Sequence, residues 1–227
     1  MVNQPILIFD VNETLLDLNS LCPLFAEWFD DEMVMREWFA NLIVYSQTVT
    51  LAGLQSDFGA LAAGVLQMLG SIHNVEITND EINRLRLALG SLPAHTDAAA
   101  SLDHLRARGF RMVTLTNSPP SDGPTALERA GLAGYFEQAF SVQPSKKFKP
   151  APDTYQLVMN ALEVGPNDLC LVACHAWDTI GLQAMGGKGA LVTHYVNAAL
   201  PVPGIPQPDL VAPSLSALSQ MISEKWC

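Results

Sequence analysis

Residues 5–18, PILIFDVNETLLDL, decide how the rest of the sequence is interpreted. The first five residues are apolar, and such a short run is typical of a buried β-strand. Asp10 follows at once, so a carboxylate stands where this strand ends. In a parallel α/β sheet the functional crevice borders the carboxyl ends of the strands. Asp10 is therefore a candidate nucleophile, although a turn-forming or capping carboxylate is the common alternative at such a position.

Composition narrows the class of protein. The chain has 227 residues, of which 49% are hydrophobic and 15% charged, so a sizeable core is expected. A net charge of −11 disfavours nucleic acid or an anionic membrane as a partner. The four cysteines show neither a C-x-x-C pair nor metal-ligand spacing, and no leader-like run opens the sequence. We therefore expect a reduced, cytoplasmic protein with no membrane association.

Hydrophobic periodicity divides the chain into two parts. From about residue 18 to residue 89 the apolar residues recur at helical spacing, with no convincing strand. After Pro93 strands and helices alternate, which indicates a parallel sheet. The predicted fold is α/β: a doubly wound parallel sheet interrupted by a helical-bundle cap. Residues 1–16 and 93–227 are expected to form the core and residues 17–92 the cap.

Several elements of the core have expected positions. Strands are predicted at residues 110–116, 139–142, 168–174 and 189–194, and a helix is expected after Asp178. Residues 198–209 are rich in proline and are predicted to be a surface connection. A closing helix is expected over residues 215–226. The uncharged stretch from Trp38 to Ser56 is long enough to span a bilayer, but its polar residues favour a buried helix and loop.

Polar residues cluster at the predicted strand ends. Thr116 and Asn117, Lys149 and Asp178 all lie there, so they should converge with Asp10 at one edge of the sheet. Each has an ordinary alternative when taken alone: turn chemistry for Thr116–Asn117 and helix capping for Asp178. Their convergence is the main functional signal.

Neighbouring residues would support a carboxylate nucleophile. Pro150 restricts the backbone of Lys149, and an ammonium beside Asp10 would keep the carboxylate ionised. Thr14, four residues after Asp10, supplies a hydroxyl or backbone donors. His175 is either a donor at the site or a structural histidine.

In this arrangement the sequence resembles the haloacid dehalogenase superfamily. The segments FDVNETLLD, TLTNS, the lysine of FKPAPDTY and CHAWD resemble its four motifs in order. The helical segment stands where that superfamily carries a type 1 cap. Asn12, the A-W-D sequence, the cap length and Tyr155, six residues after Lys149, resemble the (S)-2-haloacid dehalogenases in particular.

The resemblance also explains why Asn12 is not an acid. Phosphatases of the superfamily usually carry an acid at this position, which protonates the leaving alkoxide. Halide is a poor base and needs no proton, so a dehalogenase dispenses with that acid. The phosphatases also tend to have a second acid in the fourth motif to hold magnesium, whereas Asp178 stands alone. The resemblance therefore implies an enzyme without a metal or other cofactor.

The reaction implied by the resemblance has two steps and a small 2-haloacid substrate. Asp10 would displace halide from C2 to give an aspartyl ester, and water near Asp178 and Lys149 would then hydrolyse it. Thr116 and Asn117 would bind the substrate carboxylate, helped by donors near Asn12. Further residues expected at the substrate are Thr14, Tyr155 and His175.

Some positions depart from the resemblance. Family dehalogenases have Tyr at the position of Asn12, Asn at that of His175 and a hydroxyl at that of Ala173. The cap arginine that receives halide aligns with Phe39, with Arg36 three residues away. Two alternatives remain: Arg36 takes its place, or aromatic edges and amides such as those of Trp38, Phe39 and Asn41 receive the halide. These departures indicate a divergent subgroup.

Two other functions stay open at this point. One is a phosphatase or phosphonate hydrolase of the same superfamily, which Asn12 and the solitary Asp178 disfavour. The other is a non-catalytic binder of small carboxylates, which the altered pocket favours. The apolar face of the cap helices fits core packing or the surface of a homodimer.

Overall fold

The computed structural model describes residues 4–120, 123–194 and 196–227. Their strands form one six-stranded sheet in the order β3-β2-β1-β4-β5-β6, and every neighbouring pair is parallel. This order starts at β1 and runs outward in both directions, as in doubly wound sheets. The strands are β1 (Ile6–Phe9), β2 (Met112–Thr116), β3 (Gln138–Ser141), β4 (Leu169–Ala173), β5 (Lys188–Val192) and β6 (Leu210–Ala212).

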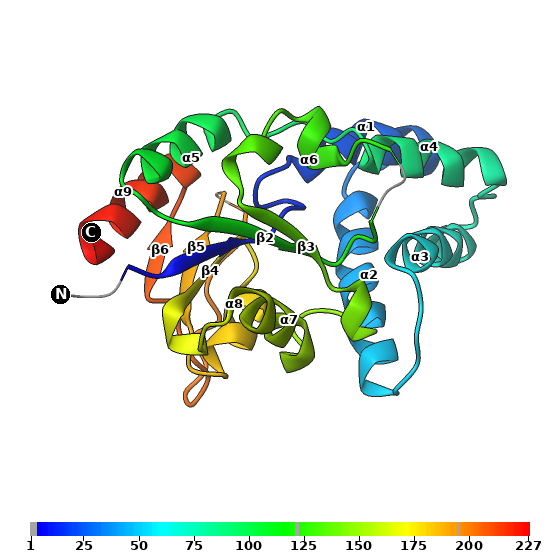
Figure 1. Cartoon of the computed structure of the whole chain (residues 1–227). Helices are drawn as coiled ribbons and strands as arrows, with labels where there is room; N and C mark the ends of the chain where they lie inside the picture. Colours follow the sequence, from blue (N-terminus) through cyan, green and yellow to red (C-terminus); the bar gives the residue numbers. More distant parts are fainter. Residues whose placement is uncertain (1–3, 121–122, 195) are drawn as a thin grey trace.

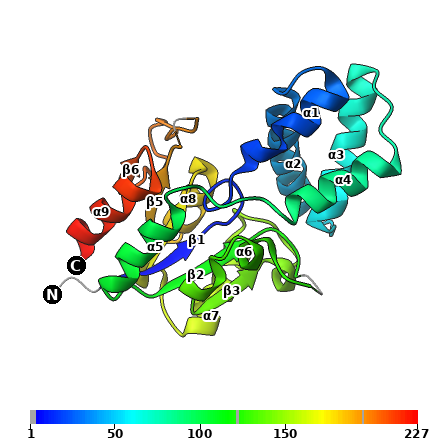
Figure 2. The ribbon, with the colours of Figure 1, turned by 90° about the horizontal axis from the view of Figure 1, so that it is seen from above.

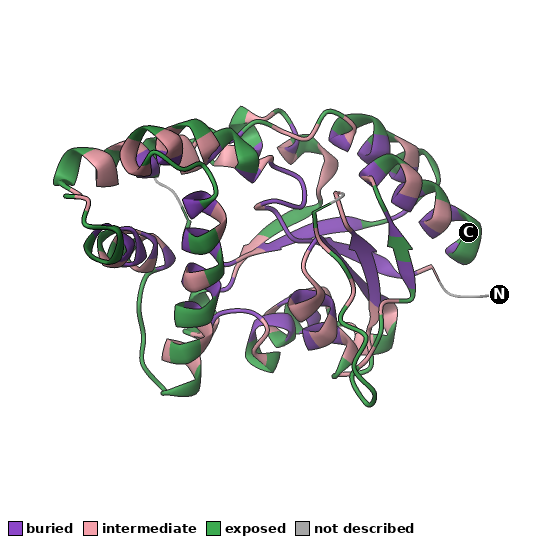
Figure 3. Ribbon diagram, turned by 180° about the vertical axis from the view of Figure 1, so that it is seen from behind, coloured by how far each residue is buried: buried purple, intermediate pink, exposed green. Residues whose placement is uncertain are grey.

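Helices cover both faces of the sheet (Figure 1). One layer contains α5 (Ala98–Ala107), α6 (Ala126–Arg129) and α9 (Leu215–Trp226). The opposite layer contains α7 (Pro152–Leu162) and α8 (Ala176–Gln183). The central strands β1 and β4 are buried along their whole length because they are covered from both sides (Figure 3).

The inserted segment forms a separate helical layer beside the sheet (Figure 2). After a short 3₁₀ turn at Leu18–Leu21 it contains α1 (Cys22–Phe29), α2 (Val34–Leu51), α3 (Phe58–His73) and α4 (Asn79–Leu89). Phe25 of α1 packs against Trp38 of α2, with 5.5 Å between ring centroids. Thr78 and Glu81 form a capping box at the start of α4. The predicted fold class, a doubly wound sheet with a helical cap, is confirmed.

The two connections between cap and core run side by side. Leu16 and Ala94 form an antiparallel bridge, and the Asp17 amide donates to the Pro93 carbonyl at 2.7 Å. The His95 amide donates to the Leu15 carbonyl at 2.9 Å. These contacts lie at the residues predicted as domain boundaries, so the cap leaves and rejoins the core at one place.

One predicted element needs correction, and one strand was not predicted. The helix expected after Asp178 begins earlier, at Ala176, so Asp178 lies in its first turn and not at its cap. Strand β6 was not predicted, because it has only three residues and follows a proline-rich segment. Among the described residues no helix combines the length and apolarity needed to cross a membrane, and the stretch from Trp38 to Ser56 forms most of α2 and the loop that follows.

Candidate active site

The candidate site lies where the sheet order changes direction. The strand that follows β1 along the chain, β2, lies on one side of this point, and the strand that follows β4, β5, lies on the other. The ends of β1, β2 and β4 adjoin one another. The Asp10 amide donates to the Val172 carbonyl at 3.0 Å, which extends the β1–β4 ladder by one residue. The ladder therefore fixes the backbone of Asp10 at the predicted edge.

Two donors hold the Asp10 carboxylate. The Thr14 hydroxyl donates to Oδ2 at 2.6 Å, and the Lys149 ammonium contacts Oδ1 at 2.8 Å. Asp10 is only 5% exposed, so these contacts replace most of its hydration. One carboxylate held by a hydroxyl and an ammonium suits an ionised nucleophile.

Lys149 joins two carboxylates. Its Nζ contacts Asp10 and also Asp178 at 2.5 Å, and its side chain is 1% exposed. Burial alone lowers the pKa of Lys149, but the two neighbouring carboxylates outweigh burial and raise it. The side chain is therefore a fixed cation. Its backbone amide donates to Asn117 Oδ1 at 3.0 Å, so the end of β2 positions the lysine.

Asp178 and Tyr155 lie behind the lysine. Asp178 is fully buried, and its Oδ1 accepts a hydrogen bond from the Tyr155 hydroxyl at 2.7 Å. Neither residue lines the pocket beside Asp10. Tyr155 was predicted to contact substrate, but it is fully buried and its hydroxyl binds Asp178 instead. Likewise the fully buried Thr14 holds Asp10 and accepts from the Cys174 amide at 3.0 Å, and so positions the nucleophile.

A small pocket of about 10 Å³ opens beside Asp10, with room for roughly one water molecule. A wider cleft of about 390 Å³ shares Phe58 and Asn117 with this pocket, and we regard it as the approach to the site. The small pocket is lined by Asp10, Asn12, Phe39, Ile43, Phe58, Thr116, Asn117, His175 and Trp177. Of the residues predicted to bind substrate, the structure thus brings Asn12, Thr116, Asn117 and His175 to the nucleophile.

The residues expected to receive halide do not all reach this pocket. Phe39 lines it, whereas Trp38 is fully buried and its indole N–H donates to the Ala62 carbonyl. Asn41 donates to the Glu37 carbonyl one turn earlier on α2. Arg36 pairs with Glu13 and with Asn19 and does not line the pocket. The structure therefore does not place Trp38, Asn41 or Arg36 in the pocket, where the halide was expected. Helical spacing could not separate the core and outer faces of α2 from its pocket face.

Four residues at the site were not predicted. Glu13 is buried beside His175, and Ile43, Phe58 and Trp177 line the pocket. Glu13 was visible as an acid inside the first motif, and Trp177 stands in the A-W-D sequence next to Asp178. Phe58 gave no separate signal, because it shares the apolar periodicity of α3.

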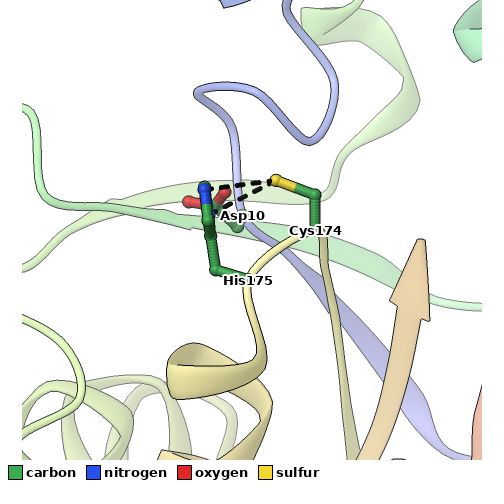
Figure 4. Close-up of side chains that lie close together, drawn as sticks. All are labelled: Asp10, Cys174 and His175. Carbon is green, nitrogen blue, oxygen red and sulfur yellow. Dashed lines mark hydrogen bonds between the residues drawn. The ribbon is translucent and has the colours of Figure 1, made fainter. Parts of the chain in front are cut away.

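The site does not fit a metal ion. Asp10, Cys174 and His175 offer ligand atoms within 4.8 Å of one another (Figure 4). Burial raises the pKa of the Cys174 thiol, which keeps it protonated, whereas a metal requires the thiolate. A metal ion could instead lie between Asp10 and Asp178, but the Lys149 ammonium already contacts both carboxylates. Magnesium prefers oxygen ligands and would have to displace this ammonium.

Comparisons with known proteins agree with this geometry and confirm the resemblance seen in the sequence. The model of the family "haloacid dehalogenase-like hydrolase" matches residues 5–186. Over 217 residues, 95% of both chains, the protein is 31% identical to (S)-2-haloacid dehalogenase 1 of Pseudomonas sp. (strain CBS-3). A solved dehalogenase structure with an intermediate complex superposes with a TM-score of 0.89 at 26% identity, covering 98% of this chain and 99% of that one. Phosphoglycolate phosphatase of Vibrio parahaemolyticus serotype O3:K6 (strain RIMD 2210633) is 28% identical over 54% of each chain. The chain therefore belongs to the haloacid dehalogenase-like hydrolase family.

Proposed function

We propose that this hydrolase is a dehalogenase that converts short (S)-2-haloacids to (R)-2-hydroxyacids. The observation that carries the proposal is the place of Lys149. Its ammonium contacts both Asp10 and Asp178, so both carboxylates are already paired with a protein cation and neither is free to hold a divalent metal. Asn12 supports the same conclusion, because its amide donates to Ser118 Oγ at 3.2 Å and cannot protonate an alkoxide.

The first step is a displacement at C2 of the substrate. A carboxylate oxygen of Asp10 forms a bond to C2, and the carbon–halogen bond breaks with its electron pair leaving on halide. The configuration at C2 inverts. Asn12, Thr116 and Asn117 line the pocket beside Asp10 and are the residues to which we assign the substrate carboxylate.

The second step is hydrolysis of the aspartyl ester. Water attacks the carboxyl carbon of Asp10, and the bond from that carbon to the substrate oxygen breaks. Lys149 stabilises the negative charge that develops on the other Asp10 oxygen. Of the two protons of the attacking water, one passes to the substrate oxygen as it leaves and gives the hydroxyl of the 2-hydroxyacid, and the other is released to solvent, so Asp10 returns as a carboxylate. Lys149 keeps its positive charge throughout because Asp178 also contacts it. The attack avoids C2, so the substrate carbon inverts once.

A phosphatase is the second candidate, supported by the partial similarity to phosphoglycolate phosphatase. It would need an acid for the leaving alkoxide and a magnesium site. Among the residues that line the pocket, Asp10 is the one carboxylate, and it is already paired with Lys149. The geometry therefore supports dehalogenation better.

The test is halide release from (S)-2-chloropropionate in the presence of a chelator. We expect chloride and (R)-lactate in equal amounts, with no release by Asp10→Asn. Phosphate esters with magnesium form the comparison. Phosphate release that needs magnesium, together with no chloride release from either enantiomer, would overturn the proposal in favour of the phosphatase.

A further inference from the structure

His175 has an unusual environment for a residue that faces the pocket. Its ring stacks against Trp177 at 5.2 Å between centroids and packs against Phe39 at 5.4 Å. Its Nε2 lies 2.7 Å from Glu13 Oε2, and its Nδ1 lies 3.3 Å from Cys174 Sγ. The imidazole thus packs against two aromatic rings, and both of its nitrogens lie close to side chains of this protein.

Glu13 anchors this histidine. Its backbone has φ of +65°, a left-handed conformation, and its side chain is 3% exposed. His95 Nε2 lies 2.9 Å from the Glu13 carbonyl and supports this loop. Burial raises the pKa of Glu13, but His175 and Arg36 outweigh burial and lower it to about 2. Glu13 is therefore an ionised carboxylate with one cation on either side.

The charged surroundings favour a protonated His175. Burial lowers its pKa, but its polar neighbours, among them the ionised Glu13 carboxylate at 2.7 Å, outweigh burial and raise it well above the usual value. The Asp10 carboxylate also faces the ring, because its oxygen lies within 4.8 Å of a ring nitrogen. Two cations oppose these groups: Lys149, 5.8 Å from the Trp177 ring, and Arg36, on the far side of Glu13.

The other cations near the site do not line the pocket beside Asp10, and Lys146 and Lys147 line the wider cleft instead. Lys149 is enclosed by two carboxylates, and Arg36 pairs with Glu13 and Asn19. Of the residues that line the described pocket, His175 is the one side chain that can carry a positive charge. We propose that His175, held by Glu13, is the halide-binding cation of this pocket. This inference rests on the proposed dehalogenase function and assigns its leaving-group site.

The mode of binding follows from the two occupied nitrogens. Halide would meet the ring through its C–H edge and its delocalised charge, beside the edges of Phe39 and Trp177. A diffuse cation with aromatic neighbours suits a large, weakly hydrated anion. We therefore expect bromide to bind more tightly than chloride, and fluoride to bind least. No bond forms or breaks at His175; it stabilises the charge on the departing halide.

The experiment measures inhibition by bromide during turnover of (S)-2-bromopropionate. In His175→Gln we expect the inhibition constant for bromide to rise about tenfold or more, the loss typical of one charge-assisted contact, together with a lower kcat. His73→Gln is the matched control, because His73 also pairs with a glutamate but belongs to the cap surface. Unchanged bromide inhibition in a folded His175→Gln enzyme would overturn the inference, and so would a rise in KM alone.

A pH profile gives a second readout. The wild-type rate should fall as pH rises through the pKa of His175, because the imidazole then loses its charge. Glu13→Gln should move this fall to lower pH, and His175→Gln should abolish it. Wild type that releases no halide would instead refute the proposed function. Halide release with an alkaline limb that survives in His175→Gln would refute only the role of His175.

Discussion

Burial removes the hydration of a lysine ammonium, and nearby carboxylates compensate for this loss. Lys149 is 1% exposed, and Asp10 and Asp178 supply two carboxylates within 2.8 Å of its Nζ. The same contacts place the nucleophile and its cation in one rigid unit. Catalysis and local stability therefore depend on the same three side chains.

Replacing this lysine by an apolar residue should affect both properties. In Lys149→Met the two buried carboxylates face each other without a cation, so we expect a loss of about 3–5 kcal/mol in the free energy of unfolding. Activity should fall below detection. Adding Asp178→Asn should restore part of the stability but no activity, as measured by urea unfolding and halide release. Equal stability of wild type and Lys149→Met would contradict the ion pairs described here.

The sequence predicted some side chains better than others. Lys149 was identified because Pro150 follows it and because it lies in the third motif. The pairing of Glu13 with Arg36 and His175 was missed, since these residues come from three separate elements. Trp38 was misplaced because residues on one face of α2 divide between the cap core and the pocket. Spacing defines a face, and packing decides what that face contacts.

At the scale of elements, α8 brings Asp178 to the lysine. The helix begins directly after β4, and Asp178 lies in its first turn, where the helix dipole favours a carboxylate. Gly181, one turn later, allows close approach to α7. A Cβ at this position would lie 2.7 Å from Pro150 Cβ and would also overlap the Tyr155 hydroxyl. The absence of a side chain here therefore lets Tyr155 reach Asp178.

Gly181→Ala should consequently be harmful although alanine is the better helix former. The propensity gain of roughly 0.5–1 kcal/mol is smaller than the usual 1–3 kcal/mol cost of overpacking. We expect lower stability and a lower kcat, because Tyr155 must move from Asp178. Gly64→Ala in α3 is the control: nothing lies within 4 Å of its added Cβ, so it should be neutral or stabilising. Equal thermal stability shifts in the two variants would contradict the close packing of α8.

The elements were predictable to different degrees. The apolar runs that became β1 and β4 were clear because both strands are covered on two faces. The edge strand β6 was not, because Leu210–Ala212 is too short for periodicity and pairs with β5 alone. The start of α8 was misjudged by three residues, since Asp178 resembles a capping residue in sequence.

At the scale of the molecule, the helical cap lies beside the sheet (Figure 2) and contributes side chains to the pocket. Phe39 and Ile43 of α2 and Phe58 of α3 form the apolar side of the pocket. Arg36 of α2 pairs with Glu13 of the core, so one ion pair joins cap and core beside the nucleophile. The position of the cap is thereby linked to the charge of Glu13 and, through it, to His175.

This linkage predicts how stability depends on pH. The Glu13 pKa falls from 4.5 to about 2 on folding, so its contribution is complete above pH 4.5 and disappears as pH falls through 2. A difference of about 2.5 units corresponds to roughly 3 kcal/mol. The raised pKa of His175 acts in the opposite direction: its contribution is complete below pH 6.5 and is lost as pH rises through the folded value. Both contributions are complete between about pH 4.5 and 6.5.

The measurement is the free energy of unfolding of wild type and Glu13→Gln across this range. Between pH 5 and 2 the wild type should lose roughly 3 kcal/mol more than the variant, since only the wild type must protonate Glu13. Arg86→Gln, which removes a surface cation of the cap that contacts the neutral Asn83, serves as the control and should follow the wild-type curve. Parallel curves for wild type and Glu13→Gln would show that Glu13 is not paired as described.

The central claim is that the Asp10 carboxylate forms an ester with the substrate carbon. A single turnover of (S)-2-chloropropionate in ¹⁸O-labelled water, with enzyme in excess, tests it most directly. We expect one ¹⁸O atom in the proteolytic peptide that contains Asp10 and unlabelled oxygen at C2 of the lactate. An unlabelled Asp10 peptide together with ¹⁸O at C2 would mean that water attacks the substrate itself, and would contradict the account.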